Sequence, residues 1–329
     1  MTTLLFPLIR TLNDQHFHSG VELANEFAIS RGTVYNLIQQ AKVMGLEIHS
    51  VKGKGYRLVH SYEWLDVAAL REKLAQTNRN MHLDVLDQVD STNTCLMERM
   101  RAGNEPSVLC AEYQTGGRGR RGRQWAAVPG GSLIFSLSWR FEQPVGELGG
   151  LSLAIGLAMA RAMSTHSKQA LELKWPNDIV SGYRKLAGIL VEIQGEASGP
   201  SVAVIGIGVN LSLPKALRLD IAQGVVDLEE LGWTGRRNGL LADCLDQLIA
   251  MLKEFGQTGF APLVEEWSRS HAYQNKYVNL MLPDGTKETG KVAGVDAGGA
   301  LLVEQGNGNL RRYSCGEVSL RAQQVRSTA

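Results

Sequence analysis

The chain has 329 residues, enough for two or three domains of about 100–200 residues each with a sizeable buried core. Its 34 Lys and Arg side chains nearly balance its 33 Asp and Glu side chains. The resulting net charge of +1 gives no overall reason to bind nucleic acid or an anionic membrane, so any basic site must be local.

The cysteines and the apolar stretches bear on the cellular compartment of the protein. Cys95, Cys110, Cys244 and Cys315 form neither a CxxC pair nor a Cys/His cluster with metal-ligand spacing, so we expect reduced thiols. The N-terminus lacks a basic leader. The longest apolar stretch, Leu148 to Met163, is interrupted by Arg161 and is shorter than the ~20 residues that span a bilayer. We therefore expect a cytoplasmic protein with no membrane partner.

The first 60 residues have the pattern of a winged helix-turn-helix. Apolar spacing predicts a helix over Leu4–Leu12 and a second helix after Ser19, which forms a capping box with Glu22. A third predicted helix, Arg31–Met44, has Ser30 as its N-cap. The expected buried face of the second helix consists of Val21, Leu23, Ala24 and Phe27. Two predicted strands, Leu46–Val51 and Tyr56–Val59, flank a turn at Lys52–Gly55 and form the wing.

Such a domain either binds DNA or serves only as a packing module. Residues 1–60 carry six basic and four acidic side chains, which is a modest excess. Because phosphate contacts dominate DNA affinity, binding would rely on the third helix and the wing, strengthened by a dimer. The residues we expect to face DNA are Ser30, Arg31, Thr33, Tyr35, Asn36, Lys52 and Lys54.

From about residue 63, predicted strands alternate with helices. The strands are Met81–Leu86, Ser107–Tyr113, Ser132–Trp139, Ala170–Lys174, Ala187–Gln194 and Val202–Asn210. The helices are Trp64–Leu74, Thr94–Arg101, Leu148–Ser164 and Leu240–Phe255. Short Gly-containing turns between neighbouring strands favour a mixed or antiparallel sheet, and therefore an α+β fold.

The tail from about residue 271 changes character. It is predicted to form a small β-barrel from four short strands, with a turn at Pro283-Asp284-Gly285: Tyr277–Leu282, Gly290–Val295, Ala300–Glu304 and Leu310–Tyr313. We therefore expect a multidomain α+β chain divided into residues 1–62, 63–270 and 271–323.

A segment that we call the arginine loop, residues 116–123, follows a predicted strand that ends near Tyr113. It places Arg118, Arg120, Arg121 and Arg123 among four glycines. Glycines let the backbone approach an anion closely, and guanidinium groups match phosphate or carboxylate geometry. The alternative is a short RNA-binding tract of RG type, although Trp125 follows it rather than further repeats. The loop lacks the Lys-Ser/Thr ending of a phosphate-binding Walker loop.

Two other segments concentrate polar groups near one predicted hairpin. Lys174–Asp178 and Lys185 bring together two lysines and a carboxylate. In an adenylation site a lysine can neutralise charge on the α-phosphate, while an aspartate can hold Mg²⁺ or orient an amine. A solvated surface turn is the alternative.

Two further motifs are ambiguous in isolation. Helix capping alone would explain Ser91-Thr92-Asn93. Residues 206–210, GIGVN, lack the third glycine of a dinucleotide fingerprint and lie in a predicted strand.

In combination, the motifs resemble biotin-protein ligases in order and spacing. The segments are Ser91-Thr92-Asn93, Glu112-Tyr113-Gln114, GRGRRGRQW at 117–125, KWPND at 174–178, RKLAGIL at 184–190 and GIGVN at 206–210. The winged helix, with GKGYRL at 53–58, resembles the bifunctional bacterial type that also represses the biotin operon. The resemblance covers nearly the whole chain and implies a class II synthetase-like central domain and an SH3-like C-terminal barrel.

The resemblance also implies roles for individual residues. A buried ureido ring of biotin needs donors and acceptors, and those implied are Ser91, Thr92, Asn93 and Gln114. The residues implied to cover the biotin carboxylate and adenylate phosphate are Gly117, Arg118, Gly119, Arg120 and Arg121, with Trp125 closing against adenine. The implied catalytic residues are Lys185, Arg118 and Asp178, supported by Lys174, Asn177 and Gly188. Asp178 would be the Mg²⁺ ligand, and Asn210 and Arg321 would lie on the nucleotide side.

Two half-reactions are implied. A biotin carboxylate oxygen attacks the α-phosphorus of Mg-ATP to give biotinyl-5′-adenylate, and a lysine of the biotin carboxyl carrier protein of acetyl-CoA carboxylase then displaces AMP. Closure of the arginine loop would trigger homodimerisation and binding to biotin operon DNA.

Three alternatives remain. They are a ligase whose winged helix does not regulate transcription, a biotin-sensing DNA binder without catalysis, and a lipoate ligase. The recognition helix, with few basic groups and a helix-weakening Gly32, leaves the first alternative open.

Overall fold

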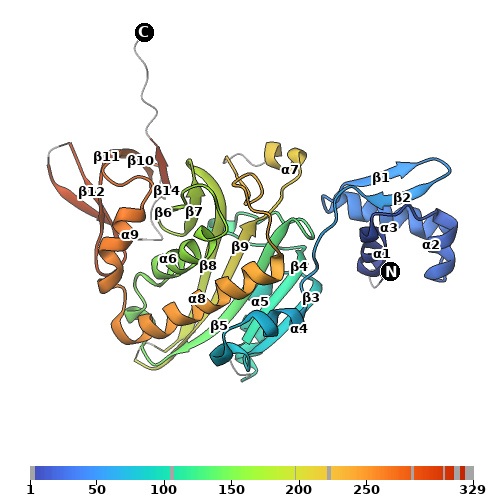
Figure 1. Cartoon of the computed structure of the whole chain (residues 1–329). Coiled ribbons are helices and arrows are strands. Elements are labelled where there is room, and N and C mark those ends of the chain that lie inside the picture. The colour runs from blue at the N-terminus through green and yellow to red at the C-terminus, as the bar shows by residue number, and fades with distance from the viewer. Residues whose placement is uncertain are drawn as a thin grey trace, which may run out of the picture.

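The computed structural model describes residues 4–103, 107–196, 198–220, 224–282, 285–306, 308–314 and 319–322. Figure 1 shows three parts in sequence across the molecule. The N-terminal helices and hairpin lie at one end, a large sheet with its helices lies in the middle, and a second sheet lies at the other end.

The N-terminal part confirms the predicted winged helix-turn-helix. Its elements are α1 (Leu5–Thr11), α2 (Gly20–Glu26), α3 (Arg31–Val43), β1 (Ile48–Val51) and β2 (Gly55–Leu58), the last two paired antiparallel. The predicted capping box of Ser19 and Glu22 is present. The prediction that Val21 is buried is wrong, because its side chain is 50% exposed. Val21 lies about 200° around the helix from the buried Leu23, so both cannot face the core.

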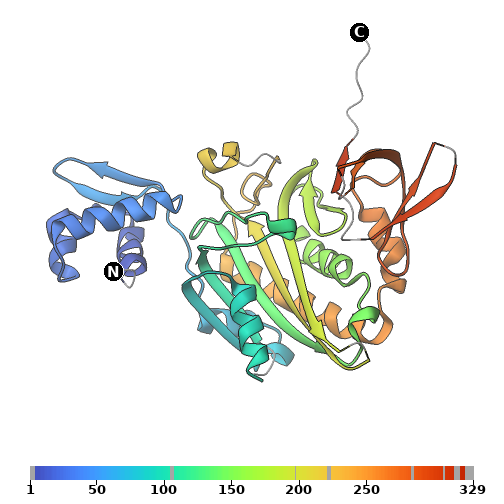
Figure 2. The same cartoon turned by 180° about the vertical axis from the view of Figure 1, so that it is seen from behind.

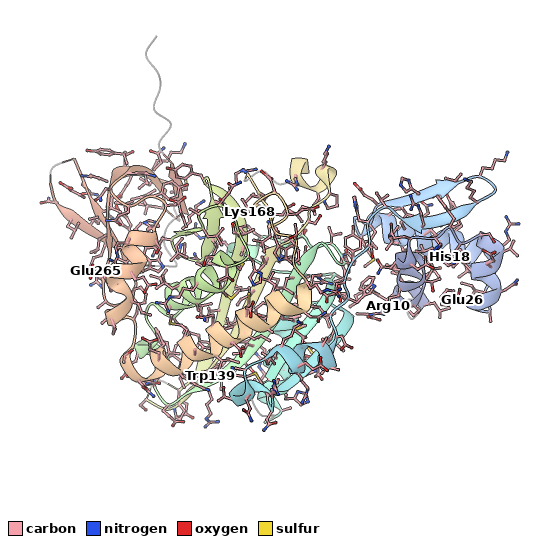
Figure 3. The ribbon with its side chains drawn as sticks, in the orientation of Figure 1. Arg10, His18, Glu26, Trp139, Lys168 and Glu265 are labelled. Carbon is pink, nitrogen blue, oxygen red and sulfur yellow. The ribbon has the colours of Figure 1, made fainter. Side chains whose placement is uncertain are left out.

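Several contacts join this part to the central sheet and to the segment that follows the wing. Arg10 pairs with Asp87 of the central sheet, which raises the pKa of the Arg10 guanidinium, and lies over the Trp64 ring at 5.1 Å from the ring centre. Figure 3 labels Arg10 on the side of the N-terminal part nearest the centre of the molecule. The Asn13 side chain also exchanges two 2.8 Å hydrogen bonds with the backbone of Tyr62.

The described residues of the central part form a seven-stranded mixed sheet in the order β3-β4-β5-β9-β8-β7-β6. Only β3 and β4 run parallel among its pairs, which confirms the predicted mixed α+β sheet. The strands are β3 (His82–Val89), β4 (Ser107–Gln114), β5 (Ser132–Phe141), β6 (Glu172–Lys174), β7 (Asp178–Ser181), β8 (Arg184–Gly195) and β9 (Ser201–Asn210).

Helices cover the two faces of this sheet unequally. One face carries the main core beneath α4 (Val67–Lys73), α6 (Leu151–Ser164) and α8 (Arg237–Thr258) (Figure 1). The opposite face carries α5 (Thr92–Arg101), visible from behind in Figure 2. Side chains alternate along β4 accordingly: Val108 and Cys110 join the main core, whereas Leu109 packs with Leu96 of α5. The α5 face is the one on which the polar motifs gather.

Two helices of the central part begin a few residues later than predicted, each for a local reason. The α6 helix begins at Leu151 rather than Leu148, because Gly150 precedes it with a φ of 80°. The α4 helix begins after Asp66, whose carboxylate accepts a hydrogen bond from the Ala69 amide.

A buried ion pair fixes the strand that leads into the arginine loop. Glu112 on β4 is fully buried, accepts a hydrogen bond from the Leu65 amide at 2.7 Å and pairs with Arg237 of α8 at 2.9 Å. Arg237 also donates to the carbonyls of Glu63 and Ser132. A buried charge needs such partners, and these tie β4 to α8 and to the segment before α4.

After α7 (Lys215–Asp220) and α8, a short helix α9 (Val264–Ser270) leads into the C-terminal part. Its described residues form a five-stranded antiparallel sheet in the order β13-β12-β11-β10-β14, which confirms the predicted SH3-like class. The strands are β10 (Tyr277–Met281), β11 (Lys287–Val295), β12 (Leu301–Glu304), β13 (Leu310–Tyr313) and β14 (Ser319–Ala322). Of the predicted turn, Pro283 and Asp284 lie outside the described residues.

The expected thiols and lack of membrane helices can be checked over the same residues. Cys95, Cys110 and Cys244 are free, and Cys315 lies outside the described residues. Burial raises the pKa of the Cys110 and Cys244 thiols above the ordinary value, so neither is a ready nucleophile. No helix in the described ranges has both the length and the apolar character needed to cross a bilayer.

Candidate active site

The first turn of α5 and the end of β4 contribute a buried cluster of polar side chains, which we call the polar pocket. Ser91, Thr92 and Asn93 are each less than 5% exposed. Ser91 caps the helix, and both the amide and the hydroxyl of Thr92 donate to Gln114 Oε1, at 2.7 and 3.0 Å. Capping is therefore only part of the role of this motif, because it also joins α5 to Gln114.

A serine on β5 lies beneath the pocket and completes it. The Ser136 Oγ is 2.6 Å from both Thr92 Oγ1 and Asn93 Oδ1. The Asn93 Nδ2 donates to the Leu190 carbonyl at 3.3 Å and to Glu192 Oε2 at 2.8 Å, both on β8. Donors and acceptors thus line one buried wall, which suits a ligand that has both kinds of group.

Three glycines, Gly188, Gly206 and Gly208, form a bare patch of backbone on the same face, which we call the glycine platform. Gly188 and Gly208 are directly opposite each other on β8 and β9. A Cβ on Gly208 would lie 2.3 Å from the Trp125 ring, and one on Gly206 would lie 2.3 Å from Asn93 Oδ1. The platform therefore admits the Trp125 indole and the Asn93 amide against the sheet.

The arginine loop is held in a hydrogen-bonded turn that ends at Trp125. The Gly119 amide donates to the Arg123 carbonyl at 2.7 Å, and the Trp125 amide donates to the Gly117 carbonyl at 2.9 Å. Arg121 has a φ of 56° and an exposed side chain. These hydrogen bonds fold the loop back on itself in front of Trp125.

The loop's arginines reach different elements. Arg118 Nη2 donates to Thr94 Oγ1 on α5 at 3.1 Å and to Glu192 Oε2 on β8 at 3.2 Å. Arg120 Nη1 donates to Asn177 Oδ1 at 3.4 Å, next to the β6–β7 turn. The loop consequently spans the polar pocket and the KWPND segment.

Lys185 and Asp178 meet as predicted. The Lys185 Nζ is 2.7 Å from Asp178 Oδ1, and both side chains are largely buried. A register shift between β7 and β8 lies beside Lys185, and such irregularities re-aim side chains. The same ammonium is 5.4 Å from the centre of the Trp125 ring. Lys185 thus lies between the carboxylate and the indole above the glycine platform.

The other residues of the KWPND segment are held by strand pairing and by hydrogen bonds to two different elements. Lys174 is 6% exposed and lies directly opposite Asp178, and Asn177 Nδ2 donates to the Ile189 carbonyl at 2.7 Å. The Trp175 amide donates to His271 Nε2 at 3.4 Å. Burial, with the charges of Lys276 and Lys174, lowers the pKa of His271 to about 3, so its neutral ring can accept this bond.

Asn210 and Arg321 were expected on the nucleotide side. Asn210 Nδ2 donates to the carbonyls of Lys185 and Val226, at 3.2 Å each, so its amide braces the backbone of Lys185. Arg321 pairs through its backbone with Asn279, and its side chain lies outside what the structure describes.

Asp178 is also the expected Mg²⁺ ligand. The described residues contain no cluster of three or more His, Cys, Asp or Glu that could hold a metal. One carboxylate still fits Mg²⁺, because this ion is commonly bound by one or two carboxylates together with substrate phosphates.

Sequence reasoning missed two participants, Ser136 and Glu192, and it gave no structural reason for Gly206 and Gly208. Two glycines two residues apart on one strand put bare backbone on the same face, and that signal was available. Ser136 and Glu192 carry no local signal, because their partners lie far away in the sequence.

The expected DNA-facing residues lie on one helix and the wing. Arg31, Tyr35, Asn36, Lys52 and Lys54 are all exposed. The remaining two lie at the start of α3, where Ser30 is the N-cap and its Oγ accepts a hydrogen bond from the Thr33 amide at 3.0 Å. At the other end of α3, Met44 and Gly45 share a pocket of about 230 Å³ with Gln114, Gly117 and Trp125. The winged helix therefore adjoins the site.

Comparison with known proteins gives matches along the whole chain. Residues 85–210 match the biotin/lipoate A/B protein ligase family, residues 5–57 an HTH domain, and residues 274–321 the biotin protein ligase C terminal domain. The bifunctional ligase/repressor BirA of Salmonella typhimurium is 37% identical over 98% of each chain. Its Escherichia coli counterpart is 36% identical over 97% of this chain and 98% of its own.

Among solved structures, the biotin protein ligase from Aquifex aeolicus in complex with biotin and ATP is similar. It has a TM-score of 0.62 and 29% identity, and the match covers 74% of this chain and 99% of that one.

The glycine platform gives a first prediction. Replacing Gly208 with alanine would put a Cβ 2.3 Å from the indole, so Trp125 must move and the arginine loop loses its anchor. We expect trypsin to cut the ligand-free loop several-fold faster. As a control, Gly239→Ala adds a Cβ with nothing within 4 Å and should leave the cleavage rate unchanged. Equal cleavage of the loop in both variants would contradict the anchoring role.

Proposed function

The chain belongs to the biotin protein ligase family, and we propose that it activates biotin with ATP, transfers it to a carrier lysine and represses biotin synthesis genes. The carrier is the biotin carboxyl carrier protein of acetyl-CoA carboxylase. The division into a DNA-binding part at 1–62, a catalytic part at 63–270 and a C-terminal part at 271–323 is part of this proposal.

The observation that carries the proposal is the convergence on one face of the sheet. A polar pocket, an aromatic ring on bare backbone and two cations from separate segments meet there. The pocket suits the ureido ring of biotin, with its two N–H donors and one carbonyl. The Trp125 ring suits the flat base of ATP, and its Nε1–H is buried without an acceptor among the described residues.

In the first half-reaction, a biotin carboxylate oxygen attacks the α-phosphorus, and the bond from phosphorus to the leaving pyrophosphate breaks. Lys185 and Arg118 would stabilise the negative charge that grows on the phosphate oxygens. Both now face carboxylates, at 2.7 and 3.2 Å, so binding exchanges one anionic partner for another. Mg²⁺ arriving with ATP would neutralise the pyrophosphate, with Asp178 as its protein ligand.

In the second half-reaction, a carrier lysine attacks the carbonyl carbon of the mixed anhydride, forming an amide and releasing AMP. The protein needs no nucleophile of its own. The arginine loop would exclude water from the anhydride while the carrier approaches. This role suits its place between the pocket and the KWPND segment.

We propose that the winged helix binds operator DNA as part of a homodimer that forms when the adenylate is bound. The shared pocket between the end of α3 and the site supports such communication. We place the protein in the cytoplasm, where ATP, the carrier and DNA meet.

The ligase proposal is tested with biotin, ATP, Mg²⁺ and an apo carrier domain. The native chain should label the carrier lysine. Lys185→Gln should slow adenylate formation by about 10²–10³-fold, because removing one preorganised donor to the developing charge costs about this much. It should leave biotin binding nearly unchanged.

Lys253→Gln is the matched control, since Lys253 is exposed on α8, which lies on the opposite face of the sheet. No label on the carrier would refute ligase activity. Preferential adenylation of lipoate over biotin would instead support the lipoate ligase alternative.

The DNA proposal is tested on the protein's own biotin-gene promoter. Lys52→Ala with Lys54→Ala should weaken binding to all sequences and reduce the slope of log affinity against log salt by about 2, one for each lost phosphate contact. Asn36→Ala should instead reduce discrimination between operator and random DNA. Lys253→Ala is the control. A salt slope unaffected by the wing substitutions would rule out the wing as a phosphate contact.

A further inference from the structure

A turn of two residues, Gly182 and Tyr183, joins β7 to β8 immediately before Lys185. Ser181 pairs with Arg184 across this turn. Both turn residues have a positive φ, 55° for Gly182 and 65° for Tyr183. Such turns favour Asn-Gly or Gly-Gly, because a bulky side chain is strained in this backbone conformation. The turn itself therefore gives no reason for a tyrosine.

The Tyr183 ring contacts the segment that leads into the C-terminal sheet. Its ring centre is 5.3 Å from that of Tyr273, and the two planes are tilted by 42°. The Lys276 ammonium is 4.9 Å from the Tyr183 ring centre and donates to the Tyr183 hydroxyl. The same ammonium donates to the Ala272 carbonyl at 2.9 Å, which fixes its direction. Aromatic pairs and cation–ring contacts are both favourable, so they offset the strain of the turn.

The same segment, residues 271–276, also holds the other end of this hairpin layer. His271 forms a parallel bridge with Leu173 of β6, and the next amide along the chain donates to the Leu173 carbonyl at 2.8 Å. The rings of His271 and Tyr273 meet edge to face, with their centres 6.0 Å apart. Residues 271–276 therefore contact both β6 and the β7–β8 turn.

These two contact points lie on either side of the proposed catalytic groups. Asp178 begins β7, and Lys185 is the second residue of β8. The register against β8 shifts between Ile179 and Val180, so the direction of Lys185 depends on where the turn holds its strand. A displacement of the turn would move Lys185 relative to Asp178, whose Oδ1 is 2.7 Å from the ammonium.

We propose that Tyr183 is a positioning residue for adenylate formation. Its ring attaches the β7–β8 turn to residues 271–276, and the C-terminal part thereby fixes Lys185 where charge develops on the α-phosphate. Tyr183 acts through Lys185 and not by touching a substrate. This inference rests on the proposed function and adds to that site a residue that affects the rate of the chemical step rather than biotin binding.

Substitution of Tyr183 separates its contacts from the shape of the turn. Tyr183→Gly removes the ring, whereas the turn keeps its shape because glycine adopts a positive φ without strain. Tyr183→Phe keeps the ring and loses only the hydroxyl. Tyr277→Ala is the matched control, because Tyr277 is also an exposed tyrosine and lies in the C-terminal sheet, opposite Lys291.

With biotin and Mg-ATP, Tyr183→Gly should form adenylate about tenfold more slowly, because even a small misplacement of a catalytic group is costly. Its biotin Kd should change by less than about twofold, since Lys185 acts mainly in the transition state. Tyr183→Phe should stay within about threefold of the native rate, because the cation–ring contact remains. The control should match the native chain.

The urea midpoint of Tyr183→Gly should stay near the native value, because relief of backbone strain offsets the lost contacts. A slower reaction without loss of biotin affinity or stability is a combination that a purely structural contact would not give. A native rate for Tyr183→Gly, a biotin affinity that falls as much as the rate, or a Tyr183→Phe variant as slow as Tyr183→Gly overturns the proposal.

Lys276→Ala tests the attachment without any reaction. It leaves the sequence of the turn intact, so amide hydrogen exchange over residues 179–186 should become several-fold faster if the C-terminal part holds the turn. Unchanged exchange overturns the attachment. If the native chain forms no adenylate, the proposed function fails, whereas the exchange measurement still decides whether residues 271–276 hold Tyr183.

Discussion

The site depends on the close approach of Trp125 to the bare backbone of β8 and β9. Gly188 and Gly208 face each other across these strands, and a single methyl group on Gly208 would collide with the indole. Trp125 lies two residues after the arginine loop, so its position on the glycine platform limits where the guanidinium groups can reach. The same absence of side chains at Gly206 lets Asn93 approach the sheet. One pattern of glycines therefore positions both the loop and the polar pocket.

The two cations of the site are each paired with a carboxylate of the chain. Lys185 is paired with Asp178, and Arg118 is paired with Glu192. Neither cation is left alone in a partly buried setting, where an unpaired charge is costly. In the proposed reaction, substrate anions replace these carboxylates as the partners of the two cations.

The sequence predicted those parts of the fold that depend on local patterns. Helical spacing and the capping box located α2 and α3, and the short turns predicted a mixed or antiparallel sheet. The meeting of Lys185 with Asp178 was also predicted, because a hairpin brings its two strands together. The proposed ligand contacts, including the metal role of Asp178, remain predictions.

Long-range packing could not be read from local patterns. Ser136 and Glu192 enter the site only because β5, β9 and β8 are neighbours in the sheet. The sequence argued against a dinucleotide fingerprint at residues 206–210. It did not show that the glycines there make room for Trp125 and Asn93. Asn210 was assigned to the nucleotide, while its donor hydrogens bind backbone carbonyls beside Lys185.

The central claim is that this site forms biotinyl-adenylate and shields it until an acceptor arrives. Rapid mixing of the protein with biotin and Mg-ATP, without a carrier, tests it most directly through the amount of pyrophosphate released. The account predicts a burst of about one pyrophosphate per active site that then stops, with the adenylate retained until apo carrier is added. Pyrophosphate release that requires the carrier from the start, or that continues steadily without it, would contradict the account.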